Sequence, residues 1–282
     1  MDVSEVKAIK KKTATQKKQE EREARIDLTA ALRMAARMQL NEGVCNHFSM
    51  ELPGEPDKFL INPQGFHWSE ITPDDLMVVD ESGNVLTGKH KVEPTAFFIH
   101  SRVHLRCKKK VVLHTHMPFA TALVIIQHGR LEMGANQNAM RFFGRIAYDE
   151  DYGGVALSDN EGDRIASAFG NADVVMMAHH GVIVSGDRMD YTFDDLYYLE
   201  RSCMVQVLAQ STGKPLRTQP DEVCAQVSKQ IGGERLQSEL HFKALKRFRK
   251  LDGLQCRRDT PTLAEQGVLT VAMAQPSASR RA

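Results

Sequence analysis

The spacing of apolar and polar positions predicts helices and strands in alternation along residues 27–213. Apolar residues recur at helical spacing over 27–43, and Gly43 is expected to end this first helix. Pro94 suits the first position of a second helix over 93–106, in which Phe97, Phe98 and Val103 can line an apolar side. Helical spacing returns at 118–126 and at 192–213.

Short apolar runs bounded by turn residues predict the strands. Residues 59–66 read as a strand that enters a Pro/Gly turn, 75–88 as strand, turn and strand, and 109–116 as a strand. Residues 162–186 read as helix, strand, turn and strand. Because several strands join through tight turns while helices separate others, we expect an α/β (α+β layered) fold with a mixed or largely antiparallel central sheet flanked by helices.

Four segments are expected along the chain. Residues 1–25 form a charged N-terminal arm, either a solvated helix or a disordered segment, and 26–215 form one domain. A C-terminal helical extension follows at 216–256, with a helical hairpin near 220–253. Residues 257–282 have weak periodicity and are expected to form a loose or partner-docked tail.

Composition narrows the class of protein. Lysine and arginine (37) nearly balance aspartate and glutamate (36), so neither nucleic acid nor an anionic membrane is expected as a partner. The five cysteines are scattered without a C-x-x-C pair, as reduced thiols of a cytoplasmic protein would be. No run approaches the roughly 18 apolar residues of a membrane span, and the N-terminus is too charged for a signal peptide.

Two histidines end the strand predicted at 109–116. Residues two apart on a strand point to the same face, so His114 and His116 offer two imidazole nitrogens to one cation. A third ligand can come from the adjacent pair His179 and His180, of which only one can face the same point. Gly181 follows, where the chain is expected to turn sharply or to approach another segment closely. Ordinary structural histidines are the alternative interpretation.

Glu93 precedes Pro94 at the start of a predicted helix. The helix dipole stabilises an anion there, so Glu93 can be a simple N-terminal cap. Beside a metal ion, the same carboxylate can instead accept and return a proton of the substrate.

Five stretches together resemble the class II aldolase/adducin family. They are CNHFSMELPG, FLINPQGFHWSEITPDDLMVVDESGNVLTG, EPTAFFIHSRVH, VVLHTHMPFATAL and MMAHHGVIVSG, in the family's order within residues 26–215. The resemblance implies a mostly antiparallel sheet flanked by helices, and a four-fold symmetric homotetramer with active sites between subunits. It implies that His114, His116 and His180 bind the metal, and that Glu93 is the catalytic acid/base.

The chain departs from the sugar-phosphate enzymes of the family where they hold phosphate. Asn46 and Gly65 remain, but Asn62, Gln64, Lys91 and Val92 replace the hydroxyl groups. Because phosphate recognition relies on several convergent donors, a non-phosphorylated substrate is expected.

Residues 135–154 are rich in polar, aromatic and glycine residues and are candidates for selecting the substrate. Arg141 or Arg145 can pair with a carboxylate, and Tyr148 or Tyr152 can donate a hydroxyl. Salt bridges from the two arginines to acids at 149–151 are the structural alternative. His47 and His67 are assigned by default to the surface or to the surroundings of the site.

The function expected from the resemblance is cleavage of a C–C bond, by aldol cleavage or decarboxylation, in a small hydroxy or keto acid or a sugar-like molecule. The metal would stabilise an enediolate-like charge, and Glu93 would move the proton. Three imidazoles favour Zn²⁺, while Mn²⁺, Fe²⁺ or Co²⁺ fit the same ligands. The alternatives are a non-catalytic, adducin-like binding module and a metal-dependent decarboxylase or oxygenase of an aromatic acid.

Overall fold

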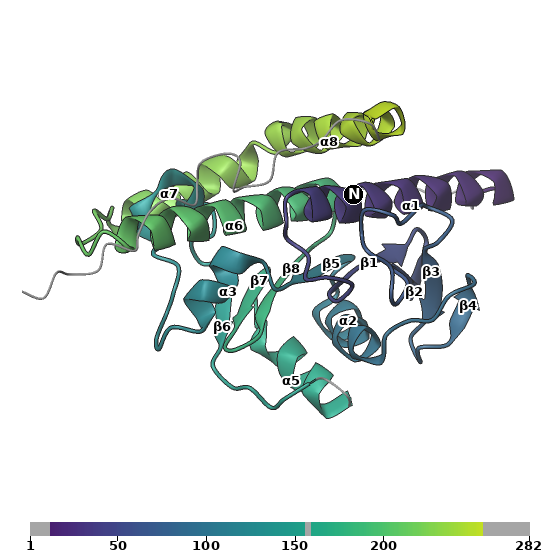
Figure 1. Ribbon diagram of the computed structural model, residues 1–282, viewed down its shortest axis with the longest axis horizontal. Coiled ribbons are helices and arrows are strands. Elements are labelled where there is room, and N and C mark those ends of the chain that lie inside the picture. Colours follow the sequence, from purple (N-terminus) through teal and green to yellow (C-terminus); the bar gives the residue numbers. More distant parts are fainter. Residues whose placement is uncertain (1–11, 156–158, 256–282) are drawn as a thin grey trace, which may run out of the picture.

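The computed structural model describes residues 12–155 and 159–255 (Figure 1). The tail expected at 257–282 and the first eleven residues of the expected arm lie outside the described residues. The described helices are α1 (Ala14–Arg37), α2 (Pro94–Cys107), α3 (Pro118–Val124), α4 (Gln137–Met140), α5 (Asp159–Ala168), α6 (Met189–Gln210), α7 (Asp221–Gly233) and α8 (Leu236–Gln255), with a 3₁₀ turn at Met133–Ala135.

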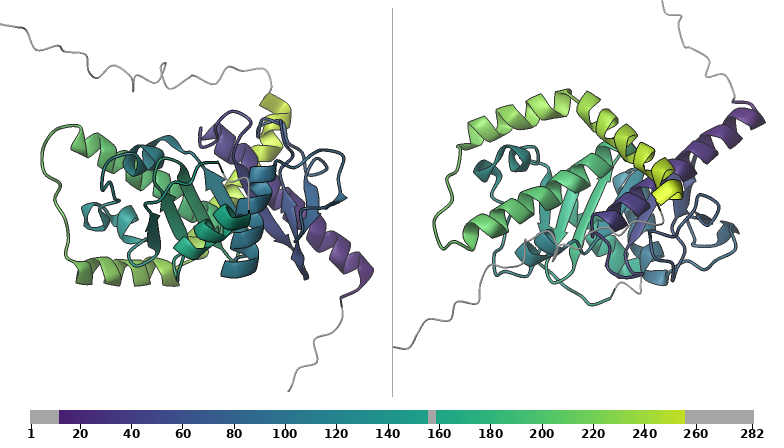
Figure 2. Two further views of the ribbon diagram at one scale, coloured as in Figure 1. Left: turned by 90° about the horizontal axis from the view of Figure 1, so that it is seen from below. Right: turned by 45° about the horizontal axis from the view of Figure 1, so that its top comes forward.

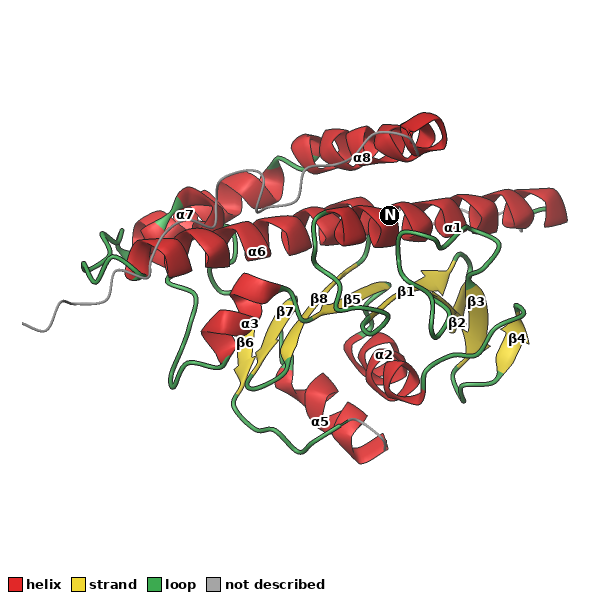
Figure 3. Ribbon diagram, viewed as in Figure 1, coloured by secondary structure: helices red, strands yellow, loops and turns green. Residues whose placement is uncertain are grey.

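An eight-stranded sheet forms the centre of the described chain (Figure 3). Its order is β4-β3-β2-β1-β5-β8-β7-β6, and every neighbouring pair is antiparallel except the parallel pair β6/β7. The expected, mostly antiparallel sheet is therefore confirmed. The strands are β1 (His47–Leu52), β2 (Glu55–Ile61), β3 (Met77–Asp80), β4 (Val85–Thr87), β5 (Val111–Thr115), β6 (Ile146–Asp149), β7 (Val174–Met177) and β8 (Gly181–Gly186).

Helices cover both faces of the sheet (Figures 1 and 2). Helices α1, α3 and α6 lie on one face, α2 and α5 on the other, and α7 and α8 run back past α6. Successive β5 residues alternate between the faces, so that Val111 and Leu113 join the core under α6 while Val112 joins the core under α2 and α5. His114 has the same parity as Val112 and lies on the α2 side. No described helix is long and apolar enough to cross a membrane.

Helix α1 differs from its prediction at both ends. It starts at Ala14, so the expected boundary at residue 25 falls inside a continuous helix. It ends at Arg37 rather than at Gly43, because Gln39 adopts a left-handed conformation (φ 58°). The Gln39 N–H then bonds the Ala36 carbonyl and the Leu40 N–H bonds the Ala35 carbonyl, which is a Schellman ending without glycine.

Strands β1 and β6 were not predicted, and the buried face of α2 differs from the expected one. In β1 the polar His47 and Ser49 occupy the inward face on the α2 side, so the strand lacks the usual apolar signal. The α2 core face combines apolar residues with two buried histidines, whereas Phe97 and Phe98 are half-exposed. The buried residues of α2 are Ala96, Ile99, His100, Ser101, Val103 and His104.

Candidate metal centre

Three histidines from two distant segments meet at one point. His114 ends β5, His116 follows it, and His180 lies in the turn between β7 and β8. Their ring centroids form a nearly equilateral triangle with sides of 5.0, 4.8 and 4.9 Å. One nitrogen of each ring lies within 4.8 Å of the others, so a single cation can be reached by all three.

The surroundings of the triad orient its nitrogens as metal ligands. His114 donates its Nδ1–H to the Val182 carbonyl oxygen at 3.0 Å, which leaves Nε2 free to bind a cation. His116 Nδ1 bonds the Glu42 carboxylate, and His116 Nε2 is buried with no hydrogen-bond partner among the described residues. A buried nitrogen left without a partner is unusual unless a ligand supplies the contact. These donors therefore fit a zinc-like cation.

Burial keeps two of the rings neutral, which is the form that binds metal. Desolvation, reinforced by the neighbouring rings of His180 and His116, lowers the pKa of His114 well below its ordinary value. Desolvation, followed by His116, lowers the pKa of His180 to about 4.

His179 and His180 are adjacent in sequence but differ in their surroundings. His179 adopts a left-handed conformation (φ 59°) and its side chain is exposed, whereas His180 is half-buried within the triad. Gly181 then permits a close approach of β8 to β5. A Cβ at this position would lie 2.5 Å from the Thr115 carbonyl oxygen and 2.8 Å from His116 Cδ2.

We expect Gly181→Ala to destabilise the protein by about 2 kcal/mol, because the added methyl forces β5 and β8 apart. Displacement of His116 should also weaken metal binding by at least about tenfold. Urea unfolding and metal titration measure the two effects. Gly232→Ala is the matched control, since a Cβ there meets nothing within 4 Å. Equal behaviour of the two variants would contradict the close-approach explanation.

The imidazole ring of His47 connects Glu93 to the triad. Its Oε2 lies 2.5 Å from His47 Nε2, and its Oε1 accepts a hydrogen bond from the Thr95 hydroxyl at 2.7 Å. His47 pairs with His114 across β1 and β5, and their rings stack with centroids 6.4 Å apart. Glu93 occupies the N-cap position of α2 without a capping hydrogen bond, so it is not the simple cap considered above. The His47 hydrogen bond lowers the pKa of Glu93 to about 2, and the Thr95 bond adds to this.

The two asparagines predicted to bind substrate are buried and brace the backbone. Asn46 Oδ1 accepts the Glu42 N–H at 3.1 Å and the His116 N–H at 3.4 Å. Asn62 Oδ1 accepts the Phe48 N–H at 2.9 Å. Gly65 has a φ of +80° with open space around its Cα, and a substrate-binding role for it stays a prediction.

Arg141 contacts acidic and aromatic side chains of α6. It is buried, its Nη1 donates to Asp194 (2.8 Å) and to Asp195 (3.0 Å), and its guanidinium stacks on the Tyr198 ring. These contacts give Arg141 a part in the packing of α4 against α6, and its binding of a substrate carboxylate stays a prediction. Among the described residues, the ion pairs of Arg141 and Arg145 go to Asp194, Asp195 and Asp173 rather than to the acids at 149–151 that were the structural alternative.

Tyr148 also has a structural contact. Its hydroxyl accepts the Leu131 N–H at 3.0 Å, and burial raises its pKa to about 12. Tyr152 is exposed, and its ring centroid lies 6.4 Å from that of His180, which makes it the better placed of the two tyrosines.

Sequence reasoning missed Glu42, which bonds His116 Nδ1. His47, assigned by default to the surface or to the surroundings of the site, is only 6% exposed and binds Glu93 directly. His67 is exposed and bonds Ser69 and Asn41.

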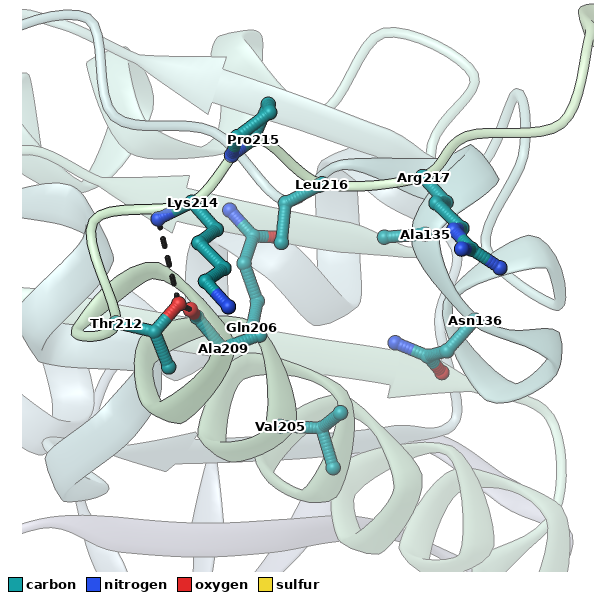
Figure 4. Close-up of a pocket in the computed structure, with 10 residues that line it drawn as sticks. All are labelled: Ala135, Asn136, Val205, Gln206, Ala209, Thr212, Lys214, Pro215, Leu216 and Arg217. Carbon is teal, nitrogen blue, oxygen red and sulfur yellow. Dashed lines mark hydrogen bonds between the residues drawn. The ribbon is translucent and has the colours of Figure 1, made fainter.

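A separate hollow lies between the end of α6 and the segment after it (Figure 4). Gln206, Lys214 and Arg217 line it, and Thr212 Oγ1 accepts the Lys214 N–H at 3.3 Å. It contains none of the residues predicted individually for the site, although Ala135 and Asn136 of the candidate segment 135–154 also line it.

Comparison with known proteins agrees with this geometry. Residues 26–207 match the model of the Class II Aldolase and Adducin N-terminal domain. The chain belongs to this class II aldolase/adducin family. Within such a family, the cluster of His114, His116 and His180 is a typical metal site.

Three similar proteins illustrate the range of this family. A Caulobacter vibrioides protein named provisionally as a class 2 aldolase is 33% identical over 74% of this chain and 82% of its own length. Decarboxylase NovR from Streptomyces niveus is 30% identical over 77% of this chain and 82% of its own length. The crystal structure of an aldolase II superfamily protein from Pseudomonas syringae aligns with a TM-score of 0.76 and 32% identity, covering 84% of this chain and 94% of that one.

Proposed function

We propose that this protein is a metal-dependent lyase that cleaves a C–C bond of a small, non-phosphorylated hydroxy or keto acid. The observation that carries the proposal is the placing of an ionised carboxylate, Glu93, one imidazole away from the three-histidine cluster. A cation site beside a proton acceptor is the arrangement that carbanion chemistry next to a carbonyl requires.

The cation would be held by His114, His116 and His180, and we propose Zn²⁺ because all three ligands are imidazoles. When bound, it supplies Lewis acidity that stabilises negative charge developing on a substrate oxygen. Glu42 bonds His116 Nδ1, and the Val182 carbonyl bonds His114 Nδ1. Each of these two rings is therefore held through the nitrogen that would not bind the cation.

Glu93 would act as the acid/base. Its side chain is 28% exposed, so substrate can reach it, and its low pKa keeps it ionised and able to accept a proton at neutral pH. The Thr95 hydroxyl and His47 hold its two oxygens in a fixed orientation.

The replacement of hydroxyl side chains supports a substrate without phosphate. The Asn62 amide already bonds the protein's own backbone through both its oxygen and its nitrogen, and the Val92 side chain offers no hydrogen bond. A phosphate would need several convergent donors.

A second candidate is decarboxylation of an aromatic acid. A hollow that Glu93 helps to line has a mixed wall, in which Phe97 and Phe98 can contact an aromatic ring and Arg102 can contact a carboxylate. The 30% identity to a protein named a decarboxylase also favours it.

A substrate screen of the zinc-loaded protein tests these proposals. Small hydroxy and keto acids, their phosphorylated counterparts, and hydroxylated aromatic acids would be followed for release of aldehyde or CO₂. We expect turnover of non-phosphorylated acids that disappears after chelation of the metal. Turnover of the phosphorylated compounds alone would contradict the proposed substrate class, and turnover of aromatic acids alone would establish the second candidate.

We propose in addition that the chain forms a homotetramer. Helix α6 buries five of its apolar side chains within its own chain, namely Met189, Phe193, Leu196, Leu199 and Cys203. Val205 and Leu208 on α6 and Leu236 and Leu240 on α8 nevertheless remain exposed, and they are available for contact between copies.

A further inference from the structure

The hollow at the end of α6 is bounded by a segment of main chain that is fixed at both ends (Figure 4). At one end the Lys214 N–H bonds the Thr212 hydroxyl oxygen at 3.3 Å, and at the other the Gln219 N–H bonds the Gly134 carbonyl oxygen at 3.0 Å. A Cβ at Gly134 would lie 2.5 Å from the Gln219 carbonyl oxygen, so the two backbones are in close contact there. The hollow therefore has a defined wall and a volume of about 320 Å³.

One part of this wall is apolar or already hydrogen-bonded. Val205 and Ala209 of α6 and Leu216 of the following segment contribute aliphatic groups. The Gln206 amide is used at both ends, since its Oε1 accepts the Glu132 N–H at 2.7 Å and its Nε2 donates to a backbone carbonyl at 2.8 Å. This part of the wall offers a ligand apolar contact.

The rest of the wall carries donors and positive charge without partners. Lys214 and Arg217 are exposed, and neither side chain has an ion-pair partner among the residues that the structure describes. Asn136 Oδ1 caps α4 by accepting the Ala139 N–H at 3.0 Å, whereas Asn136 Nδ2 is buried and has no hydrogen-bond partner within the described chain. In Figure 4 the side chains of Lys214 and Asn136 extend toward the hollow from different sides.

These features together favour an anionic ligand of small organic size. None of the residues that line the hollow is acidic, so its two cations are not neutralised from within. A buried amide donor without an acceptor is unusual unless a ligand supplies one. The volume lies at the lower end of the range for small-molecule sites, about 300–1,000 Å³, and exceeds what a bare inorganic ion would fill. The aliphatic groups suit a short carbon chain.

We propose that this hollow is a second binding site, separate from the metal centre, for a small organic anion with two negative charges. Lys214 and Arg217 would pair with the charged groups, and Asn136 Nδ2 would donate a hydrogen bond to one of them. Carboxylates and a phosphate ester present the same charged oxygens to a guanidinium, so either can supply this chemistry. The site contains none of the three clustered histidines and does not depend on the proposed lyase reaction.

Calorimetric titration of the full-length, zinc-loaded protein tests the proposal with three probes: glutarate, glycerol 3-phosphate and inorganic phosphate. We expect saturable binding of at least one of the two organic dianions at one site per chain, at least about tenfold tighter than binding of inorganic phosphate. The organic probe that binds more tightly identifies the charged group of the ligand. Binding should weaken as salt is added, because both cations are exposed.

Variants locate the binding. The double variant Lys214→Gln/Arg217→Gln should bind the probe at least about tenfold more weakly, because charge-assisted hydrogen bonds are lost. Asn136→Asp keeps the oxygen that caps α4 but replaces the free donor by a negative charge, so it should weaken binding to a similar extent. The matched control Lys229→Gln/Arg247→Gln removes the same charges from exposed positions of α7 and α8 and should leave the affinity unchanged.

A metal ion can itself bind carboxylate or phosphate, so the titration is repeated on His180→Ala. We expect this variant to keep the affinity of the unaltered protein, and loss of binding in it would place the anion on the metal and overturn the proposal. Absence of binding by both organic probes, equal affinity after Lys214→Gln/Arg217→Gln, or equal weakening in the control would overturn it too. Inorganic phosphate binding as tightly as the organic probes would overturn the ligand class. Failure of the lyase proposal would leave all these titrations unaffected.

Discussion

Replacing His180 by alanine should abolish stoichiometric metal binding, whereas replacing its neighbour His179 should leave binding intact. His180 belongs to the triangle of rings with His114 and His116, while His179 is exposed in a left-handed turn. Loss of a partner that merely orients a ligand costs about 10–100-fold in affinity, so loss of the ligand itself should exceed 100-fold. Metal analysis of the dialysed variants and competition with a chelator measure the effect.

The pair of variants is matched, because both remove one imidazole from adjacent positions of the same turn. Equal metal content of the two would show that His180 is not a ligand. Absence of metal from the unaltered protein, even after incubation with zinc, would instead favour the adducin-like binding module.

The strand period alone was enough to predict that two of the three clustered histidines lie together. His114 and His116 lie on one face of an extended segment, and neither burial nor partners were needed to see it. The choice between His179 and His180 could be made only from the family resemblance, because which of the two side chains faces the cluster depends on the φ angle of one residue. That angle is a property of the β7–β8 turn, not of the composition around it.

The groups around the ligands could not be predicted, because they depend on pairings between distant segments. His47 reaches Glu93 only because β1 pairs with β5 in a register that sets His47 opposite His114. Its strand was itself missed, since polar residues fill its inward face. The partners of Arg141 could not be predicted for the same reason, because Asp194 and Asp195 lie more than fifty residues away on α6.

Changing Glu93 to glutamine should lower kcat by about 10²–10⁴-fold on any substrate that the screen identifies, because the side chain can no longer take up a proton. Glutamine keeps the length of the side chain and its contact with Thr95, and Glu93 touches none of the three ligand rings. The metal content and the urea midpoint should therefore remain close to those of the unaltered protein. Kinetics on the metal-loaded variant, with metal analysis of the same sample, separate loss of chemistry from loss of the site.

Glu222→Gln, an exposed carboxylate near the start of α7, is the matched control and should leave turnover unchanged. Turnover of the Glu93 variant within tenfold of the unaltered protein would remove Glu93 from the mechanism. In that case Tyr152, whose ring lies beside His180, would become the next candidate for the acid/base. Loss of metal together with turnover would instead show that Glu93 acts on the ligand cluster through His47 and His114. The two measurements on one sample therefore distinguish a proton carrier from a support of the metal site.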